Sequence, residues 1–191
     1  MDIREEIFRI GKNLFGTKGF KKTNIKEIAQ SAGIGVGTFY NYYASKERLF
    51  LEIYIQENEN LKKRLMESID LDREPAKVIR ELIEGNLEAI HTNPILGEWY
   101  RKDFYKELEQ YYRNEDGTNI DSFRGFYLDL FRKWRAEGKI REDIDEELLP
   151  GFLDSLVYLD THKEEIGLHY FPQMIQYLAE FIMQGLTKSP K

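Results

Sequence analysis

The sequence contains no cysteine, which excludes disulfide bonds, thiolate metal ligands and cysteine nucleophiles. It also has no uninterrupted apolar stretch of about 18 residues, the length that a membrane-spanning helix needs. Its first residues are acidic, whereas a secretory signal peptide begins with positive charge. We therefore expect a cytoplasmic protein without a membrane partner.

Motifs of enzymes and metal sites are also missing or incomplete. The three histidines lie apart, and neither His-Glu-x-x-His nor Gly-x-Ser-x-Gly occurs. The glycine-rich run 33–38 does not fit the dinucleotide-binding fingerprint, because Thr38 replaces the third glycine and a helix precedes the run. Metal ligation by His162, Glu165 and His169 is open on spacing alone, but histidines beside acids are more often plain surface residues. The sequence therefore predicts no enzyme, no cofactor and no metal site.

Charge is distributed unevenly along the chain. The net charge is −6, but residues 1–50 hold nine basic side chains against five acidic ones, a net charge of +4. The remaining 141 residues carry a net charge of −10. Because a positive end attracts phosphate while a negative remainder is repelled by it, this polarity indicates a nucleic-acid partner at the N-terminal end.

Apolar residues recur at spacings of three and four through most of the chain, and no alternating strand pattern is present. The pattern predicts an all-α fold of about nine helices, near residues 2–16, 25–32, 35–42, 45–67, 75–91, 95–113, 119–137, 146–161 and 171–187. We expect a helix-turn-helix head at residues 1–50, joined by the long helix to a C-terminal helical domain at about 70–191.

The segment from about 24 to 43 has the parts of a helix-turn-helix motif. Asn24, with Glu27 three residues later, is a capping-box pattern that starts one short helix, and Gly33 stops it. Steps of 100° along the following helix put Phe39 and Tyr43 on one inward face. The outward face then carries a mostly polar set suited to base edges and phosphates, which is Gly37, Thr38, Tyr40 and Asn41.

Two glycines and two lysines of this region require an explanation. Gly35 and Gly37 each cost about 1 kcal/mol relative to alanine inside a helix. They indicate a close approach of the backbone to DNA, or else they only sharpen the turn after Gly33. Lys26 and Lys46 stand at helix starts, where a cation opposes the helix dipole. A phosphate contact beside a helix N-terminus explains both, and a solvated surface charge is the alternative for either one.

The residues around this motif resemble a known family. Residues 19–49 read GFKKTNIKEIAQSAGIGVGTFYNYYASKERL, and the segment from about 3 to 55 is similar to the N-terminal signature of the tetracycline-repressor (TetR) family. In two places the chain departs from that signature, because Tyr42 stands where histidine or another aromatic residue is frequent and Gly35 where serine is frequent. The resemblance implies operator contacts by Lys26, Gly35, Val36, Thr38, Tyr40, Asn41, Tyr42 and Lys46.

Two apolar stripes near the C-terminus predict a dimer. Operators of helix-turn-helix proteins contain two half-sites about 34 to 36 Å apart, so two heads have to be held in a fixed relation. The stripes either close the protomer's own core or form a four-helix interface between two copies. The resemblance implies the interface, for which we expect Phe152, Leu156, Leu159, Met174, Leu178, Phe181 and Ile182.

Aromatic residues are concentrated between residues 99 and 134. Aromatic side chains with polar tips suit a ligand pocket between helices, although aromatic stripes at helical spacing are more often core. The resemblance implies a small-molecule effector site in the C-terminal domain. The candidates for its lining are Trp99, Tyr100, Phe104, Phe123, Tyr127 and Phe131.

Together these features predict a ligand-responsive transcriptional regulator. We expect a repressor that binds a palindromic operator as a homodimer and that a small-molecule effector releases. The competing interpretation is a helical bundle that binds other proteins. It predicts no polar outward face on the third helix and no salt-dependent affinity for DNA.

Overall fold

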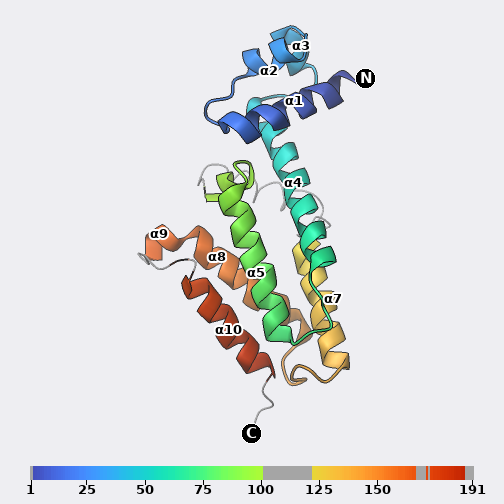
Figure 1. Cartoon of the computed structure of the whole chain (residues 1–191), viewed down its shortest axis with the longest axis vertical. Coiled ribbons are helices and arrows are strands. Elements are labelled where there is room, and N and C mark those ends of the chain that lie inside the picture. The colour runs from blue at the N-terminus through green and yellow to red at the C-terminus, as the bar shows by residue number, and fades with distance from the viewer. Residues whose placement is uncertain (1, 101–121, 167–170, 172, 188–191) are drawn as a thin grey trace. The chain divides into compact units, whose positions relative to one another are not determined.

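The computed structural model of the chain describes residues 2–100, 122–166, 171 and 173–187. These residues form helices and no strand, which confirms the predicted all-α fold (Figure 1). The α-helices are α1 (Ile3–Lys18), α2 (Ile25–Ser31), α3 (Val36–Tyr40), α4 (Lys46–Ser68), α5 (Pro75–Thr92), α7 (Ser122–Ala136), α8 (Leu149–Thr161), α9 (Lys163–Ile166) and α10 (Gln173–Thr187). Short 3-10 helices are η1 (Leu96–Tyr100) and η2 (Glu146–Leu148).

Most expected helices are confirmed within a few residues, with two differences. The helix expected at 146–161 begins with the 3-10 turn η2 and becomes α-helical only at α8, where a proline occupies the first turn. Of the helix expected at 95–113, only residues 95–100 are described, and 96–100 form η1. Among the described residues, no helix combines the length and the apolar character that crossing a membrane would require.

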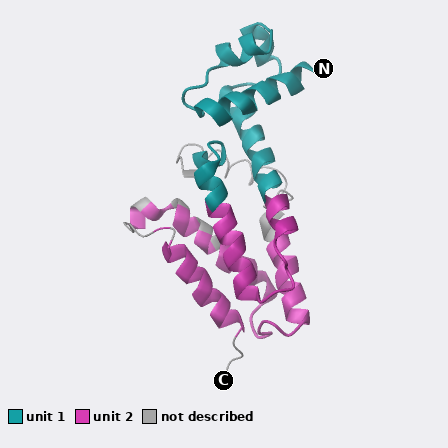
Figure 2. Cartoon of the chain, viewed as in Figure 1, with its two compact units in different colours: residues 1–61, 88–108 teal, residues 62–87, 109–191 magenta. Residues whose placement is uncertain are grey.

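The chain forms two compact units, residues 1–61 with 88–108 and residues 62–87 with 109–191 (Figure 2). Each of α4 and α5 therefore contributes residues to both units. Residues 70–75, where the sequence interpretation starts the C-terminal domain, lie inside the second unit.

The short helices of the first unit begin and end where the sequence signals predict. The Asn24 side chain accepts a hydrogen bond from the backbone nitrogen of Glu27 at 2.9 Å, which caps the start of α2. Gly19 and Gly33 follow α1 and α2 with φ angles of 78° and 68°. Only glycine adopts this left-handed region at little cost, so both residues end a helix and redirect the chain.

Aromatic packing fixes α1 on α4 in the first unit. The ring centroids of Phe15 and Phe50 lie 5.0 Å apart with nearly perpendicular planes, and Phe20 lies 4.8 Å from Phe50. The two helices approach each other closely at Gly11, where a Cβ atom would lie 2.8 Å from Cδ2 of Leu49. The pair is thus a rigid support for α2 and α3.

Glu57 of α4 joins three parts of the first unit. Its carboxylate lies 2.7 Å from Nζ of Lys12 on α1 and accepts a hydrogen bond of 3.1 Å from Nδ2 of Asn93, which follows α5. Burial raises the pKa of Glu57, but the hydrogen bonds from Lys12 and Asn93 outweigh it and hold that pKa below its usual value. The Oδ1 atom of Asn93 also accepts a hydrogen bond of 2.9 Å from the backbone nitrogen of Ile95, just before η1.

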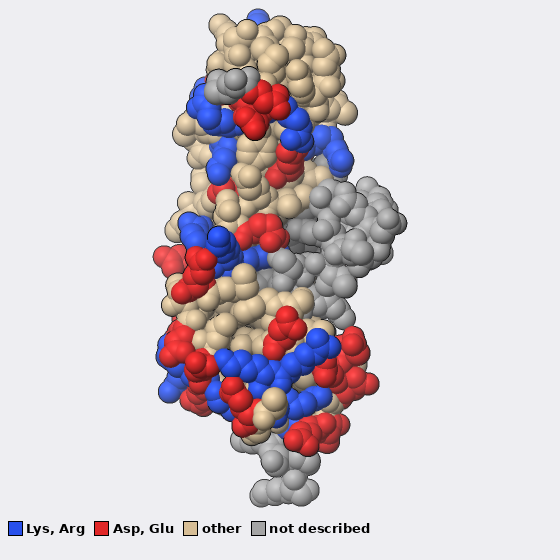
Figure 3. Space-filling view, turned by 90° about the vertical axis from the view of Figure 1, so that its right-hand side faces the viewer, with Lys and Arg blue, Asp and Glu red and all other residues tan. Residues whose placement is uncertain are grey.

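The second unit has its own core. Buried side chains of α5, α7, α8 and α10 meet there, with Phe131 and Trp134 packed edge to face at 5.7 Å. Its surface carries both signs of charge side by side, as the lower part of Figure 3 shows. Lys133 pairs with Asp72, for example, and Lys139 donates to the carbonyl oxygen of the same residue at 2.7 Å.

Candidate nucleic-acid interface

The helix α3 turns one face to the interior of the first unit. Phe39 is fully buried and Tyr43, just after the helix, is 4% exposed, and their ring centroids lie 5.9 Å apart. Both residues therefore face inward, as the periodicity predicts. The opposite face is wholly or partly open to solvent and holds the predicted DNA-contacting residues Gly35, Val36, Thr38, Tyr40, Asn41 and Tyr42.

Large apolar and aromatic side chains lie exposed on this open face. Val36 and Tyr40 are 40% and 52% exposed. The surface over α2 and α3, at the top of Figure 3, is mostly uncharged on the face shown. Exposed apolar and aromatic groups that lie together mark a contact surface, and uncharged groups suit base edges and thymine methyl groups better than phosphates.

The turn between α2 and α3 is held by backbone hydrogen bonds. The nitrogen of Gly33 donates to the carbonyl oxygen of Gln30 at 3.1 Å, and that of Ile34 donates to Ala29 at 3.0 Å. This pair of bonds is the Schellman arrangement, which satisfies the last carbonyl groups of a helix. Since Ala29 is also buried, the direction in which α3 leaves α2 is fixed by both backbone and core.

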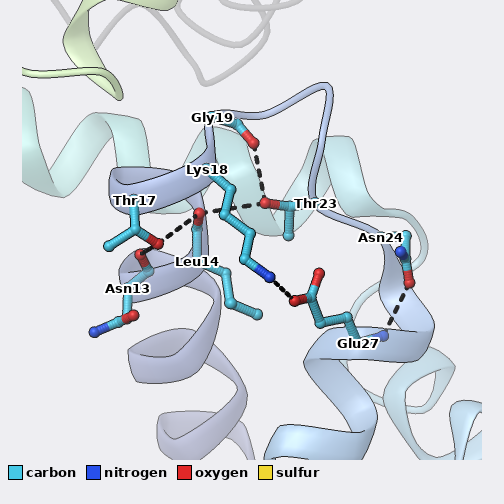
Figure 4. Close-up of polar contacts among 8 residues, drawn as sticks. All are labelled: Asn13, Leu14, Thr17, Lys18, Gly19, Thr23, Asn24 and Glu27. Carbon is cyan, nitrogen blue, oxygen red and sulfur yellow. Dashed lines mark hydrogen bonds and ion pairs between the residues drawn. The ribbon is translucent and has the colours of Figure 1, made fainter.

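The loop from α1 to α2 is anchored by polar contacts (Figure 4). Thr23 is 1% exposed, and its hydroxyl donates to the carbonyl oxygen of Gly19 at 2.9 Å, with the Leu14 carbonyl at 3.3 Å. Across the loop, Lys18 at the end of α1 forms an ion pair with Glu27 in the first turn of α2. The start of α2 is therefore tied to the end of α1 at two points.

The two predicted phosphate-contacting lysines have different surroundings. Lys26 is exposed on the first turn of α2. Lys46 is partly buried, and its Nζ donates to the carbonyl oxygens of Phe20 at 3.0 Å and Thr23 at 2.9 Å. The sequence interpretation missed this structural role of Lys46. Its phosphate contact, like that of Lys26, stays a prediction.

Six aromatic residues were expected to line an effector pocket. Phe104 and the side chains of Trp99, Tyr100 and Phe123 lie outside the described part of the structure. Phe131 is fully buried in the core of the second unit, and Tyr127 is partly buried at its edge. Phe131 therefore belongs to the core of the second unit.

The residues expected at a dimer interface are not equally open. Leu156 is 4% exposed and faces the core of its own unit, whereas Phe181 is 61% exposed. Tyr177, which the sequence interpretation did not single out, is 51% exposed and stacks on Phe181 at 6.4 Å. The remaining candidates are partly buried, and these are Phe152, Leu159, Met174, Leu178 and Ile182.

Metal ligands do not gather anywhere in the described ranges, where no three histidine, aspartate or glutamate side chains are grouped so that they could hold an ion. Of the three residues whose spacing left metal ligation open, His169 lies outside those ranges. The Nδ1 atom of His162 instead lies 2.9 Å from the carbonyl oxygen of Tyr158, on whose ring the imidazole stacks at 4.0 Å.

Comparison with known proteins gives one consistent result. The family profile described as "Bacterial regulatory proteins, tetR family" matches residues 7–53. The transcriptional regulator UidR of Escherichia coli K12 is 33% identical over 156 residues, covering 81% of this chain and 78% of UidR. The transcriptional repressor KstR2 of Mycolicibacterium smegmatis is 26% identical over 191 residues, covering 97% of this chain and 91% of KstR2.

A solved structure extends the likeness to the whole fold. The repressor FadR of Thermus thermophilus superposes with a TM-score of 0.61 at 24% identity, covering 95% of this chain and 91% of that one. The similarity therefore includes the residues that follow the helix-turn-helix motif.

Proposed function

Because the chain belongs to the tetR family of bacterial regulatory proteins, we propose that it is a repressor that binds a palindromic operator as a homodimer and leaves it when a small-molecule effector binds. Its relatives are DNA-binding transcriptional regulators and not enzymes. Repression is proposed because KstR2, similar along nearly the whole chain, is a transcriptional repressor.

The open face of α3 is the observation that carries the proposal. A recognition helix has to enter a groove about 12 Å wide while the rest of the motif holds it firmly. Buried Phe39 and Tyr43 hold α3 in place. Partly exposed Thr38 and exposed Tyr40 and Asn41 provide hydrogen-bonding groups for base edges. Lys26 and Lys46, at the starts of α2 and α4, would contact the flanking phosphates.

Homodimerisation is proposed at α8 and α10. Phe181 and Tyr177 form a stacked aromatic pair that is more than half exposed in the single chain. A C2 interface is self-complementary, and aromatic residues are enriched in such interfaces. A partner chain would cover this pair together with the partly buried Leu178 and Ile182.

A small-molecule effector is proposed to act through the second unit. FadR of Thermus thermophilus is known in complex with lauroyl-CoA, which makes it a regulator of this fold that binds a small molecule. In the present chain, ligand binding would shift the separation of the two heads and so lower operator affinity. A ligand that binds tightly and leaves operator affinity unchanged would rule out this coupling.

Selection of bound DNA from a random library tests the proposal. We expect enrichment of an inverted repeat whose half-site centres lie about 10 base pairs, or a multiple of that, apart. The selected duplex should bind two chains together, which sedimentation of the complex measures. The Tyr40→Ala variant in the same selection is the control and should return a clearly weaker enrichment, although it retains its fold because Tyr40 is exposed.

Two results would overturn the proposal. The absence of any enriched sequence with the unmodified protein would show that the chain does not read DNA. Binding of one chain to a single half-site would contradict the proposed palindromic operator and dimer. It would still be consistent with DNA recognition by α3.

A further inference from the structure

Arg4, which no sequence motif singled out, lies where three parts of the first unit meet. It is in the first turn of α1, whose start is capped by the Asp2 side chain through a 3.0 Å hydrogen bond from the Arg4 backbone nitrogen. The Arg4 guanidinium donates from Nη2 to Oε2 of Glu52 on α4 at 2.7 Å. The two residues are 48 positions apart, so this ion pair ties the beginning of the chain to the long helix.

The same guanidinium also contacts the segment that follows α3. Its central carbon lies 5.3 Å from the centroid of the Tyr43 ring. Cations within about 6 Å of an aromatic face are attracted by its electrons, and arginine can stack on a ring while it also pairs with a carboxylate. Tyr43 is buried and packs on Phe39, the inward residue of α3. Arg4 thus contacts Tyr43, which packs against α3, and pairs with Glu52 of α4.

Stability alone does not account for this arrangement. The side chains of Arg4 and Glu52 are 50% and 37% exposed, and ion pairs in water contribute little to the free energy of folding. A direct phosphate contact does not fit well either, because Glu52 already neutralises the guanidinium. What the geometry does provide is a fixed position for Tyr43, and with it for the end of the helix that faces DNA.

We propose that Arg4 is a positioning residue for DNA binding, which holds Tyr43 between α1 and α4 and so fixes the orientation of α3. The proposal rests on the proposed DNA-binding function and adds a residue that acts without touching the bases. It predicts a loss of specific affinity that does not come from a lost charge.

Arg4→Lys separates geometry from charge. Lysine keeps the positive charge but has no planar group that can both stack on a ring and pair with a carboxylate. We expect operator affinity to fall roughly 3- to 10-fold, as for removal of a coupled contact, with affinity for random DNA and the salt dependence unchanged. The melting temperature should stay within a few degrees, because the pair is exposed.

Arg9→Lys, which keeps the positive charge as Arg4→Lys does, is the matched control. Arg9 is also a basic residue of α1, it is 67% exposed, and it pairs with Glu6 on the same helix at 2.6 Å. Its ion pair joins no second element, so operator affinity should stay within about twofold of the unmodified protein. An equal loss in both variants would overturn the positioning role.

A double-mutant cycle tests whether Arg4 affects operator affinity through its ion pair with Glu52. If Arg4 acts through Glu52, Arg4→Ala should cost less operator affinity in a Glu52→Ala background than in the unmodified protein. Additive losses, together with a salt slope lowered by about one, would identify Arg4 as a phosphate contact and overturn the proposal. If the unmodified protein selects no operator at all, the proposed function fails before these variants are compared.

Discussion

The Nζ atom of Lys46 lies 3.0 Å from the carbonyl oxygen of Phe20 and 4.0 Å from the centroid of the same residue's ring. The cation of the first residue of α4 therefore holds the loop between α1 and α2 in place. It also lies near a helix start that attracts phosphate, so one side chain has both a structural role and a predicted DNA contact.

The Lys46→Ala variant should show both roles at once. Loss of the two carbonyl contacts should lower the free energy of unfolding by about 1 kcal/mol, a modest value because the side chain is only partly buried. Affinity for operator and for random DNA should fall alike, and the salt slope by about one. Lys26→Ala is the comparison, since exposed Lys26 should give the same change in salt slope with an unchanged melting temperature. An unchanged melting temperature for Lys46→Ala would contradict its structural role.

The exposed face of α3 should carry specificity. Thr38→Ala and Tyr40→Ala should each weaken operator binding by about 1–3 kcal/mol and leave affinity for random DNA nearly unchanged. Fluorescence anisotropy with both duplexes measures the two affinities. Equal losses on operator and random DNA would show that these side chains contact the backbone and not the bases.

The aromatic pair on α10 should hold the dimer. Phe181→Glu should shift the protein to a monomer in sedimentation experiments and weaken operator binding, with little loss of protomer stability because Phe181 is 61% exposed. Ile166→Glu is the control, since Ile166 is 41% exposed and lies on α9, outside the helices proposed for the interface. If the Phe181 variant remains a dimer, the interface lies elsewhere.

The hydroxyl of Tyr43 should affect stability only at high pH. Its oxygen atom is buried near the Glu52 carboxylate, and burial, followed by that carboxylate, raises the pKa of Tyr43 to about 12. The folded protein then keeps a proton that the unfolded chain releases near pH 10, so its stability should fall between pH 10 and 12. Tyr43→Phe should lose less stability in that range while binding operator normally, as denaturant titrations at several pH values would show. Identical pH profiles would contradict the raised pKa.

Local signals explain why the helix-turn-helix motif could be predicted. Asn24 caps α2 and Gly33 ends it through interactions within a few residues, and such patterns can be read directly from the sequence. The inward positions of Phe39 and Tyr43 follow from helical periodicity in the same way.

Contacts between distant residues could not be predicted in this way. The partners of Lys46 lie 26 and 23 positions away, and Arg4 and Glu52 are 48 apart, so no spacing rule connects them. Periodicity also predicts an apolar helix face, but it does not show whether the core of the same unit or a second chain covers that face. For that reason Leu156 was expected at the interface although it is buried in its own unit, and exposed Tyr177 was not singled out.

The hydrogen bond between Glu57 and Asn93 has a consequence for dissecting the protein. A fragment that stops at the end of α4 would leave the Glu57 carboxylate without its amide partner. It would also lack Ile95 and Leu96, which are 3% and 1% exposed in the intact chain. The DNA-binding unit is therefore discontinuous in sequence, and no single proteolytic cut would release it as an autonomous folding domain.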